Sequence, residues 1–139
     1  MPQAVRDVMN GDIVTLPRSA PVIDAARRMR DADIGDVLVV DGPKLTGVVT
    51  DRDIVVRAIA EGKDPQSTTL ADVCSGDVVT VAPDDSIDHA AQVMRERAVR
   101  RLPVVEGGTP VGVVSLGDVA IERESSTALA DISAAKGNG

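Results

Sequence analysis

The 139-residue chain contains no phenylalanine, tyrosine or tryptophan. Its core must therefore be built from Val, Ile, Leu, Met and Ala, and a bound flat ring must be held by aliphatic side chains, because aromatic stacking is excluded. The single cysteine, Cys74, excludes an internal disulfide and cannot complete a zinc site; it is expected to be a small buried hydrophobe. The single histidine, His89, is expected on the polar side of a helix, so neither residue suits a catalytic nucleophile or base.

Positive charge is also scarce, since the formal net charge is −7 and the pI is about 4.6. This balance argues against nucleic acid as a partner, because affinity for nucleic acid depends mainly on neutralising phosphates. The arginines at 95, 97, 100 and 101 have two interpretations, a solvated helix end or a local contact for a small anion. No signal peptide, lipidation motif or membrane-length apolar run occurs, which predicts a cytoplasmic protein that does not bind a membrane.

What the sequence does contain is an internal repeat. The segment from Asp7 to Val55 matches the segment from Asp72 to Ala120 without a gap when it is shifted by 65 residues. A period of this length that occurs only twice indicates two copies of a small domain rather than a solenoid. Function is therefore expected where the two copies face each other. Matched blocks include Val14-Thr15 with Val79-Thr80, Ala25-Ala26 with Ala90-Ala91, and Gly47-Val48-Val49 with Gly112-Val113-Val114.

Hydrophobic periodicity gives both copies the same order of elements, β-α-β-β-α, and hence an α/β (α+β) fold. The first copy is expected to form strands at 13–16, 37–40 and 45–49, a helix from Val22 through Met29, and a second helix from Asp51 to about Gly62. The second copy is expected to form strands at 78–81, 102–105 and 111–114, a helix through 87–94, and another from about Gly117.

This reading divides the chain into four parts. The first unit spans 5–62, a polar linker spans 63–69, and the second unit spans 70–124. The remaining tail, 125–139, is rich in Ala, Ser, Gly and Asn and is expected to be largely flexible.

Each copy carries a Gly-led strand followed by Thr/Ser-x-x-Asp, with Thr50 and Asp53 in the first copy and Ser115 and Asp118 in the second. One interpretation is a capping box that closes the first turn of a helix. The other is a ligand site, in which the aspartate accepts hydrogen bonds from both hydroxyls of a ribose. The Thr or Ser hydroxyl and the free N–H groups of the helix start would then face a phosphate.

The two segments Gly47-Val48-Val49-Thr50-Asp51-Arg52-Asp53 and Gly112-Val113-Val114-Ser115-Leu116-Gly117-Asp118, each ending a β-α-β-β-α unit, resemble the CBS domain. The pair together resembles a Bateman module, over about Val5 to Glu122, and is similar to the small stand-alone tandem-CBS proteins of bacteria. The run from Arg100 to Val105 supports the likeness. The resemblance implies two motifs packed about a pseudo-twofold axis, and a flat, disc-shaped homodimer of two modules.

The resemblance also implies that the opening strand of one copy completes the site of the other. Thr15 would then join Ser115 and Asp118, while Thr80 would join Thr50 and Asp53. The residues expected around a purine ring are aliphatic: Leu16, Val37, Val81, Leu102 and Pro103.

The two sites are not expected to be equal. Arg100 and Arg101 stand in the second copy where the first has Gly35 and Asp36, and Asp36 would repel a phosphate. Arg52 inside the first motif offers partial compensation. The sequence therefore predicts unequal affinities.

Two functions remain open on this basis. The first is a regulatory module that senses an adenosine-containing ligand such as AMP, ADP, ATP or S-adenosylmethionine. The alternative is a protein–protein interaction or scaffold module whose clefts are empty or vestigial, docking on a protein effector. An enzyme is disfavoured, because the chain has one histidine, no metal-ligand cluster and no phosphate loop with a lysine.

No cofactor or metal is expected. The acidic pair in Asp51-Arg52-Asp53 could hold a metal ion, but acids at a helix start are more simply explained by the helix dipole. A homodimer is predicted from Val55 and Val56, which are apolar beyond what one packing face requires.

Overall fold

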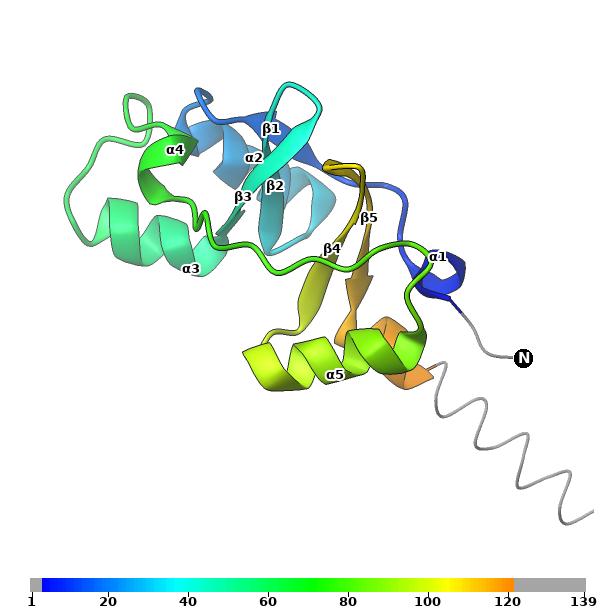
Figure 1. Cartoon of the computed structure of the whole chain (residues 1–139). Helices are drawn as coiled ribbons and strands as arrows, with labels where there is room; N and C mark the ends of the chain where they lie inside the picture. The colour runs from blue at the N-terminus through cyan, green and yellow to red at the C-terminus, as the bar shows by residue number, and fades with distance from the viewer. Residues whose placement is uncertain (1–3, 122–139) are drawn as a thin grey trace, which may run out of the picture.

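The structure is a computed structural model that describes residues 4–121. Both halves of the chain follow the predicted order, a helix packed beside a hairpin and a second helix after it (Figure 1). The first half contains α1 (Val5–Val8), β1 (Thr15–Pro17), α2 (Val22–Ala32), β2 (Asp36–Asp41), β3 (Lys44–Thr50), α3 (Asp51–Asp53) and the π-helix η1 (Ile54–Ile59). The second half contains α4 (Leu70–Val73), α5 (Ile87–Arg97), β4 (Arg101–Glu106), β5 (Thr109–Ser115) and a helical segment at 116–121.

The hairpins of the two halves share the same register. β2 and β3 pair antiparallel, with Asp36 opposite Thr50, and β4 and β5 pair antiparallel, with Arg101 opposite Ser115. Each hairpin shifts register at the same place, between Val39 and Val40 and between the equivalent Val104 and Val105. β1 adds a parallel strand to the first hairpin, so one sheet has three strands and the other has two.

The predicted strand at 78–81 does not form. Within this segment only Val81 bridges β4, opposite Val104. In the first half, the N–H groups of Leu38 and Arg18 donate to the carbonyls of Val14 and Val40 and so hold β1 in place. The equivalent residues of the second half are both prolines, Pro103 and Pro83, which have no N–H to donate.

Two short helices that the sequence reading did not predict exchange between the halves. α1 opens the first unit, but its Val5 is buried in the core of the second, beside α5 and β5. α4 opens the second unit, but its Leu70 and Val73 are buried in the core of the first. Figure 1 shows α1 beside the second hairpin and α4 beside α2, with the chain after α4 crossing back toward α5.

The residues after each exchanged helix pair with the hairpin of the opposite half. Asn10 exchanges two backbone hydrogen bonds with Val113 of β5, at 2.8 and 3.0 Å. Ser75 exchanges two with Val48 of β3, at 3.1 and 3.0 Å. Each half therefore depends on a segment of the other, and the two form one packed body.

The segment 63–69, expected to be a linker, caps α2. Pro21 at the start of this helix provides no side-chain acceptor. Instead the carbonyls of Thr68 and Pro65 accept from the N–H groups of Val22 and Ile23, at 2.8 and 2.9 Å. The linker thus satisfies helix-end donors that would otherwise be unpaired.

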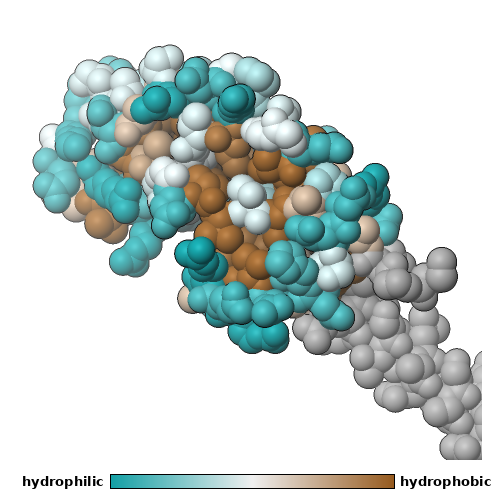
Figure 2. Space-filling model, viewed as in Figure 1, coloured by the Kyte–Doolittle hydropathy of each residue, from teal (hydrophilic) through white to brown (hydrophobic). Residues whose placement is uncertain are grey.

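Hydrophobic residues gather over the middle of the molecule, where the halves meet, while hydrophilic residues cover both ends (Figure 2). None of the helices within residues 4–121 has the length and apolar character that a membrane crossing requires. The predicted flexible tail at 125–139 lies outside the described residues.

Candidate functional site

A cleft of about 550 Å³ lies between the two halves. Its lining includes residues that the repeat makes equivalent, so the cleft lies on the pseudo-twofold axis. These pairs are Gly35 with Arg100, Asp36 with Arg101, Leu38 with Pro103, and Val48 with Val113. The aliphatic pairs give the cleft apolar walls without any aromatic ring.

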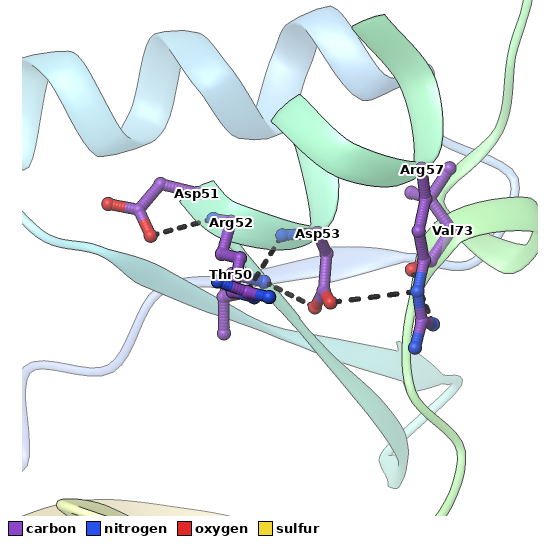
Figure 3. Close-up of polar contacts among 6 residues, drawn as sticks. All are labelled: Thr50, Asp51, Arg52, Asp53, Arg57 and Val73. Atoms are coloured by element: carbon purple, nitrogen blue, oxygen red, sulfur yellow. Dashed lines mark hydrogen bonds and ion pairs between the residues drawn. The ribbon is translucent and has the colours of Figure 1, made fainter. Parts of the chain in front are cut away.

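The motif of the first half lies at one side of this cleft. The Thr50 hydroxyl accepts from the Asp53 N–H at 3.0 Å, and Asp53 Oδ2 accepts from the Thr50 N–H at 2.9 Å (Figure 3). The capping-box interpretation is therefore confirmed for this motif. Both residues also line the cleft, and the Asp53 side chain is 17% exposed. Capping uses one carboxylate oxygen, while a carboxylate has about four acceptor positions.

Arg57, one helical turn after Asp53, forms an ion pair with the carboxylate of the motif. Its Nε lies 3.9 Å from Asp53 Oδ1, and its Nη1 donates to the carbonyl of Val73 at 3.3 Å (Figure 3). Val73 belongs to the exchanged helix α4, so the second half of the chain helps to orient this guanidinium. Arg57 then presents a positive charge at the cleft beside the free side of the Asp53 carboxylate.

The exchanged segment after α4 forms another wall. Ser75, Asp77, Val78 and Val79 line the cleft together with Thr50 and Asp53. The side chain of Thr80, which was expected to join this motif, is exposed and does not line the cleft. The opening segment of the second half therefore reaches the first motif, but through residues one to five positions before Thr80 in the chain.

Asp36 and Arg101 meet across the axis. Arg101 Nε lies 3.3 Å from Asp36 Oδ2, and the Asp36 side chain is 17% exposed. Burial raises the pKa of Asp36 above its ordinary value of 3.8; the attraction of Arg101 opposes the rise, and Asp51 adds to it. The ion pair alone would lower this pKa, and burial outweighs it because the carboxylate is more deeply buried than its partner.

Of the fourteen residues predicted to bind a ligand, six line the central cleft: Thr50, Asp53, Arg100, Arg101, Leu102 and Pro103. Leu16, Val37 and Val81 are buried in the two cores instead. Arg52 is exposed on the helix start and does not line the cleft. Whether any of these residues binds a ligand remains a prediction.

The second motif is built like the first but lies elsewhere. The Ser115 hydroxyl accepts from the Asp118 N–H at 3.1 Å, and Asp118 Oδ2 accepts from the Ser115 N–H at 2.9 Å. Neither residue lines the central cleft, and neither does Thr15, their expected partner. The central cleft is thus asymmetric, with walls from both halves and a motif from the first alone.

Several lining residues were missed by the sequence reading, above all Arg57, Leu38 and Val48. The signal for Arg57 was available, since residues four apart on a helix lie side by side and Asp53 precedes it by four.

Asp51 and Asp53 point away from each other at the helix start (Figure 3). No group of three potential metal ligands occurs within residues 4–121.

Comparison with known proteins identifies the family to which this arrangement belongs. The sequence pattern of the CBS domain matches residues 5–59 and 70–124. The CBS domain-containing protein YhcV of Bacillus subtilis is 36% identical over 122 residues, which are 88% of this chain and 86% of YhcV. Hypoxic response protein 1 of Mycobacterium tuberculosis is 35% identical over 116 residues, which are 83% of this chain and 81% of that protein.

Solved structures agree with the fold. A crystal structure of Hypoxic Response Protein I with two coordinated zinc ions matches with a TM-score of 0.79 and 34% identity, over 85% of this chain and 97% of that one. The CBS domain pair of protein MJ0100, in complex with 5′-methylthioadenosine and S-adenosyl-L-methionine, matches with a TM-score of 0.78 and 26% identity, over 91% of this chain and 99% of that one.

The matched region makes up most of YhcV and of Hypoxic response protein 1, so these relatives carry no separate catalytic domain beside the pair. The doubled β-α-β-β-α unit, the two capped motifs and the shared cleft are the parts of a regulatory module rather than of an enzyme. The chain belongs to the CBS domain family and contains two CBS domains that form one pair.

Proposed function

We propose that the chain senses an adenosine-containing ligand, such as AMP, ADP, ATP or S-adenosylmethionine, in the cleft between its two CBS domains. The position of Asp53 carries this proposal. Its Oδ2 holds the Thr50 N–H, which leaves Oδ1 at the cleft beside Arg57 to accept hydrogen bonds from a ribose. The adenosyl compounds bound to the MJ0100 pair support the same class of ligand.

The size and walls of the cleft suit a purine. A volume of about 550 Å³ is within the range of small-molecule sites, roughly 300–1,000 Å³. Leu38, Val48, Pro103 and Val113 offer aliphatic surfaces to both faces of a flat ring. In a chain without aromatic residues, such surfaces are the available means of holding adenine.

The proposal is tested by thermal unfolding, followed by circular dichroism, with and without each candidate ligand. A ligand present at about 1 mM and at about 100 times its dissociation constant should stabilise the fold by roughly 2.7 kcal/mol. Asp53→Asn should remove most of this stabilisation. The asparagine keeps one oxygen for the Thr50 N–H, so the capping box survives while the second acceptor and the charge are lost.

Asp118→Asn is the matched control, because it changes the equivalent capping box outside the central cleft. This variant should keep the stabilisation by ligand. Equal losses in the two variants would show that the aspartates act through the fold and not through the ligand.

Another observation favours the scaffold alternative. In the structure the charged groups of the cleft pair with one another, Asp36 with Arg101 and Asp53 with Arg57. A module whose cleft is satisfied internally needs no ligand, and its exposed surfaces would then serve a protein effector. Unchanged unfolding temperatures across the whole ligand panel would favour this function.

Self-association is part of the proposal. Val55, Val56 and Ile59 of η1 are 58%, 46% and 55% exposed, and Leu116 and Ile121 of the equivalent segment are 46% and 66% exposed. These are the large exposed hydrophobic side chains among residues 4–121, and they lie on equivalent helices of both halves. A second copy of the chain, which offers the same apolar helices, would cover them in a homodimer. Sedimentation as a monomer at micromolar concentration would contradict this.

Zinc, which the crystal structure of Hypoxic Response Protein I contains, has no corresponding cluster of ligands within residues 4–121. A metal ion is therefore no part of the proposed function.

A further inference from the structure

The charges that line the central cleft are nearly balanced, with an excess of one negative charge. Four carboxylates and three guanidinium groups line it: Asp36, Asp51, Asp53, Asp77, Arg57, Arg100 and Arg101. A ligand that carries several negative charges would therefore enter a cleft without net positive charge to receive it. This balance already distinguishes between ligands that share an adenosyl group.

Two of the three guanidinium groups are engaged inside the cleft. Arg57 lies 3.9 Å from Asp53 and donates to the carbonyl of Val73, and Arg101 lies 3.3 Å from Asp36. Among the arginines of the cleft, only Arg100 forms no ion pair within the described part of the chain. A polyphosphate that contacted either of the other two would lie beside the carboxylate with which that guanidinium is already paired.

Asp36 is one of these two carboxylates. Its side chain is 17% exposed, so a phosphate group that approached Arg101 would meet the Asp36 carboxylate where water screens the repulsion poorly. Its neighbour Gly35 has no side chain to add a donor, and Asp51 contributes a second negative charge nearby. A neutral or cationic group meets no such repulsion, and a cation would be attracted to Asp36.

We propose that Asp36 is a specificity-determining residue of this cleft, which selects adenosyl ligands that are uncharged or cationic beyond the ribose and disfavours nucleoside di- and triphosphates. The inference rests on the proposed sensing function and narrows its ligand class. Adenosyl groups that carry a thioether or a sulfonium meet the requirement. Chains of phosphates do not.

Isothermal titration with four probes tests the inference: 5′-methylthioadenosine, S-adenosylmethionine, AMP and ATP. The wild-type chain should bind the two sulfur compounds at least tenfold more tightly than ATP, a difference of about 1.4 kcal/mol or more. Asp36→Asn removes the charge with little change of shape and frees Arg101. It should shift the ratio of the ATP affinity to the methylthioadenosine affinity about tenfold in favour of ATP.

Asp41→Asn is the control, because Asp41 ends the same strand, is exposed, and lies outside the cleft. It makes the same change of charge and should leave the ratio as in the wild type. If the wild type binds ATP as tightly as methylthioadenosine, or if Asp36→Asn leaves the ratio unchanged, the inference is overturned while the sensing function stands. If no probe binds to either protein, the proposed function fails and the inference fails with it.

Discussion

The opening segments of the two halves differ although they occupy equivalent positions. In the first half β1 pairs with β2 over three residues, and in the second a single residue, Val81, bridges β4. Proline at 83 and 103 removes one donor at each end of the equivalent ladder. Val78 and Val79 line the cleft and lie outside any strand, as do their equivalents Ile13 and Val14 in the first half. Two residues without an N–H group thus account for the difference between a three-residue ladder and a single bridge.

The helices after the two hairpins differ as well. In the first half η1 is a π-helix, with the N–H of Ala60 donating to the carbonyl of Val55, whereas residues 116–121 are α-helical. Arg57 of η1 contacts both Asp53 and Val73, and the residue equivalent to Arg57 in the second sequence copy is Glu122. The first motif therefore has a cation close by at a position where the second copy has an acidic residue.

Together these differences show how a repeat becomes asymmetric in function while its backbone stays alike. The register, the bulges and the capping boxes agree between the halves. The charges at equivalent positions are opposite, as in Asp36 and Arg101. Both residues line the one central cleft, so their charges do not test the prediction that two related sites bind a ligand unequally. A titration that found two equal sites per chain would contradict that prediction.

The largest expected effect comes from the glycines where each exchanged segment crosses a hairpin. A Cβ atom on Gly47 would lie 2.9 Å from Cys74 Sγ and 2.9 Å from the backbone carbonyl oxygen of Ser75. That carbonyl accepts from Val48 and cannot move without losing the hydrogen bond. Gly47→Ala should therefore reduce the free energy of unfolding by about 2–3 kcal/mol in urea denaturation.

Gly112→Ala is the equivalent change in the second half and should cost less, about 1 kcal/mol. There the closest atom to a new Cβ is Met9 Sδ, at 2.6 Å, which belongs to a flexible side chain, and the nearest backbone atom, the carbonyl oxygen of Asn10, is 3.1 Å away. Equal losses, or a larger loss at Gly112, would show that the two crossings are packed alike and that the backbone of Ser75 is free to adjust.

The next effect concerns the pH dependence of stability and the Asp36–Arg101 pair. Burial raises the pKa of Asp36 above 3.8 in the folded chain, so the folded state holds this proton more tightly than the unfolded state does. The contribution of Asp36 to stability is therefore lost as the pH rises from 3.8 through the raised pKa. Asp36→Asn should be more stable than the wild type at neutral pH, and thermal unfolding should show the difference shrinking as the pH falls toward 3.8.

Arg101 tolerates the loss of its partner in this variant because its side chain is 42% exposed and can be hydrated. Asp41→Asn again serves as the control for the loss of one carboxylate. A variant that is less stable than the wild type at neutral pH would mean that the ion pair outweighs burial, which reverses the direction of the pKa shift.

Much of the fold was accessible from the repeat, because both hairpins and both long helices follow simple hydrophobic patterns. The exchange of α1 and α4 was not, since an apolar residue such as Val5 or Leu70 does not reveal which of two similar cores it enters. The choice of Val37 rather than Leu38 as a cleft residue failed for a related reason. Residues 37–39 are all buried, so this strand has no alternation that distinguishes its faces.

The capping boxes were one of the two interpretations that the spacing of the motif allowed, since their hydrogen bonds are local. The pairing of Asp36 with Arg101 could not be predicted from local spacing. These residues are 65 positions apart in the chain and meet only when the two halves pack about the pseudo-twofold axis. Sequence reasoning left open which cleft Arg101 faces, and the structure brings both charges into one cleft.

The smallest expected effect restores the missing ladder of the second half. Pro83→Ala with Pro103→Leu supplies N–H groups that can donate to the carbonyls of Val105 and Val79, as Arg18 and Leu38 do in the first half. The gain of two hydrogen bonds is opposed by the greater freedom of the unfolded chain without proline, so stability should change by less than about 1 kcal/mol.

Amide hydrogen exchange should nevertheless be slow at 83 and 103 in this variant. The control is Pro43→Ala, whose new amide lies in the exposed turn between β2 and β3 and should exchange rapidly. Rapid exchange at 103 would mean that proline is not what limits the ladder of the second half to Val81, and that this segment is held by its packing against the first half.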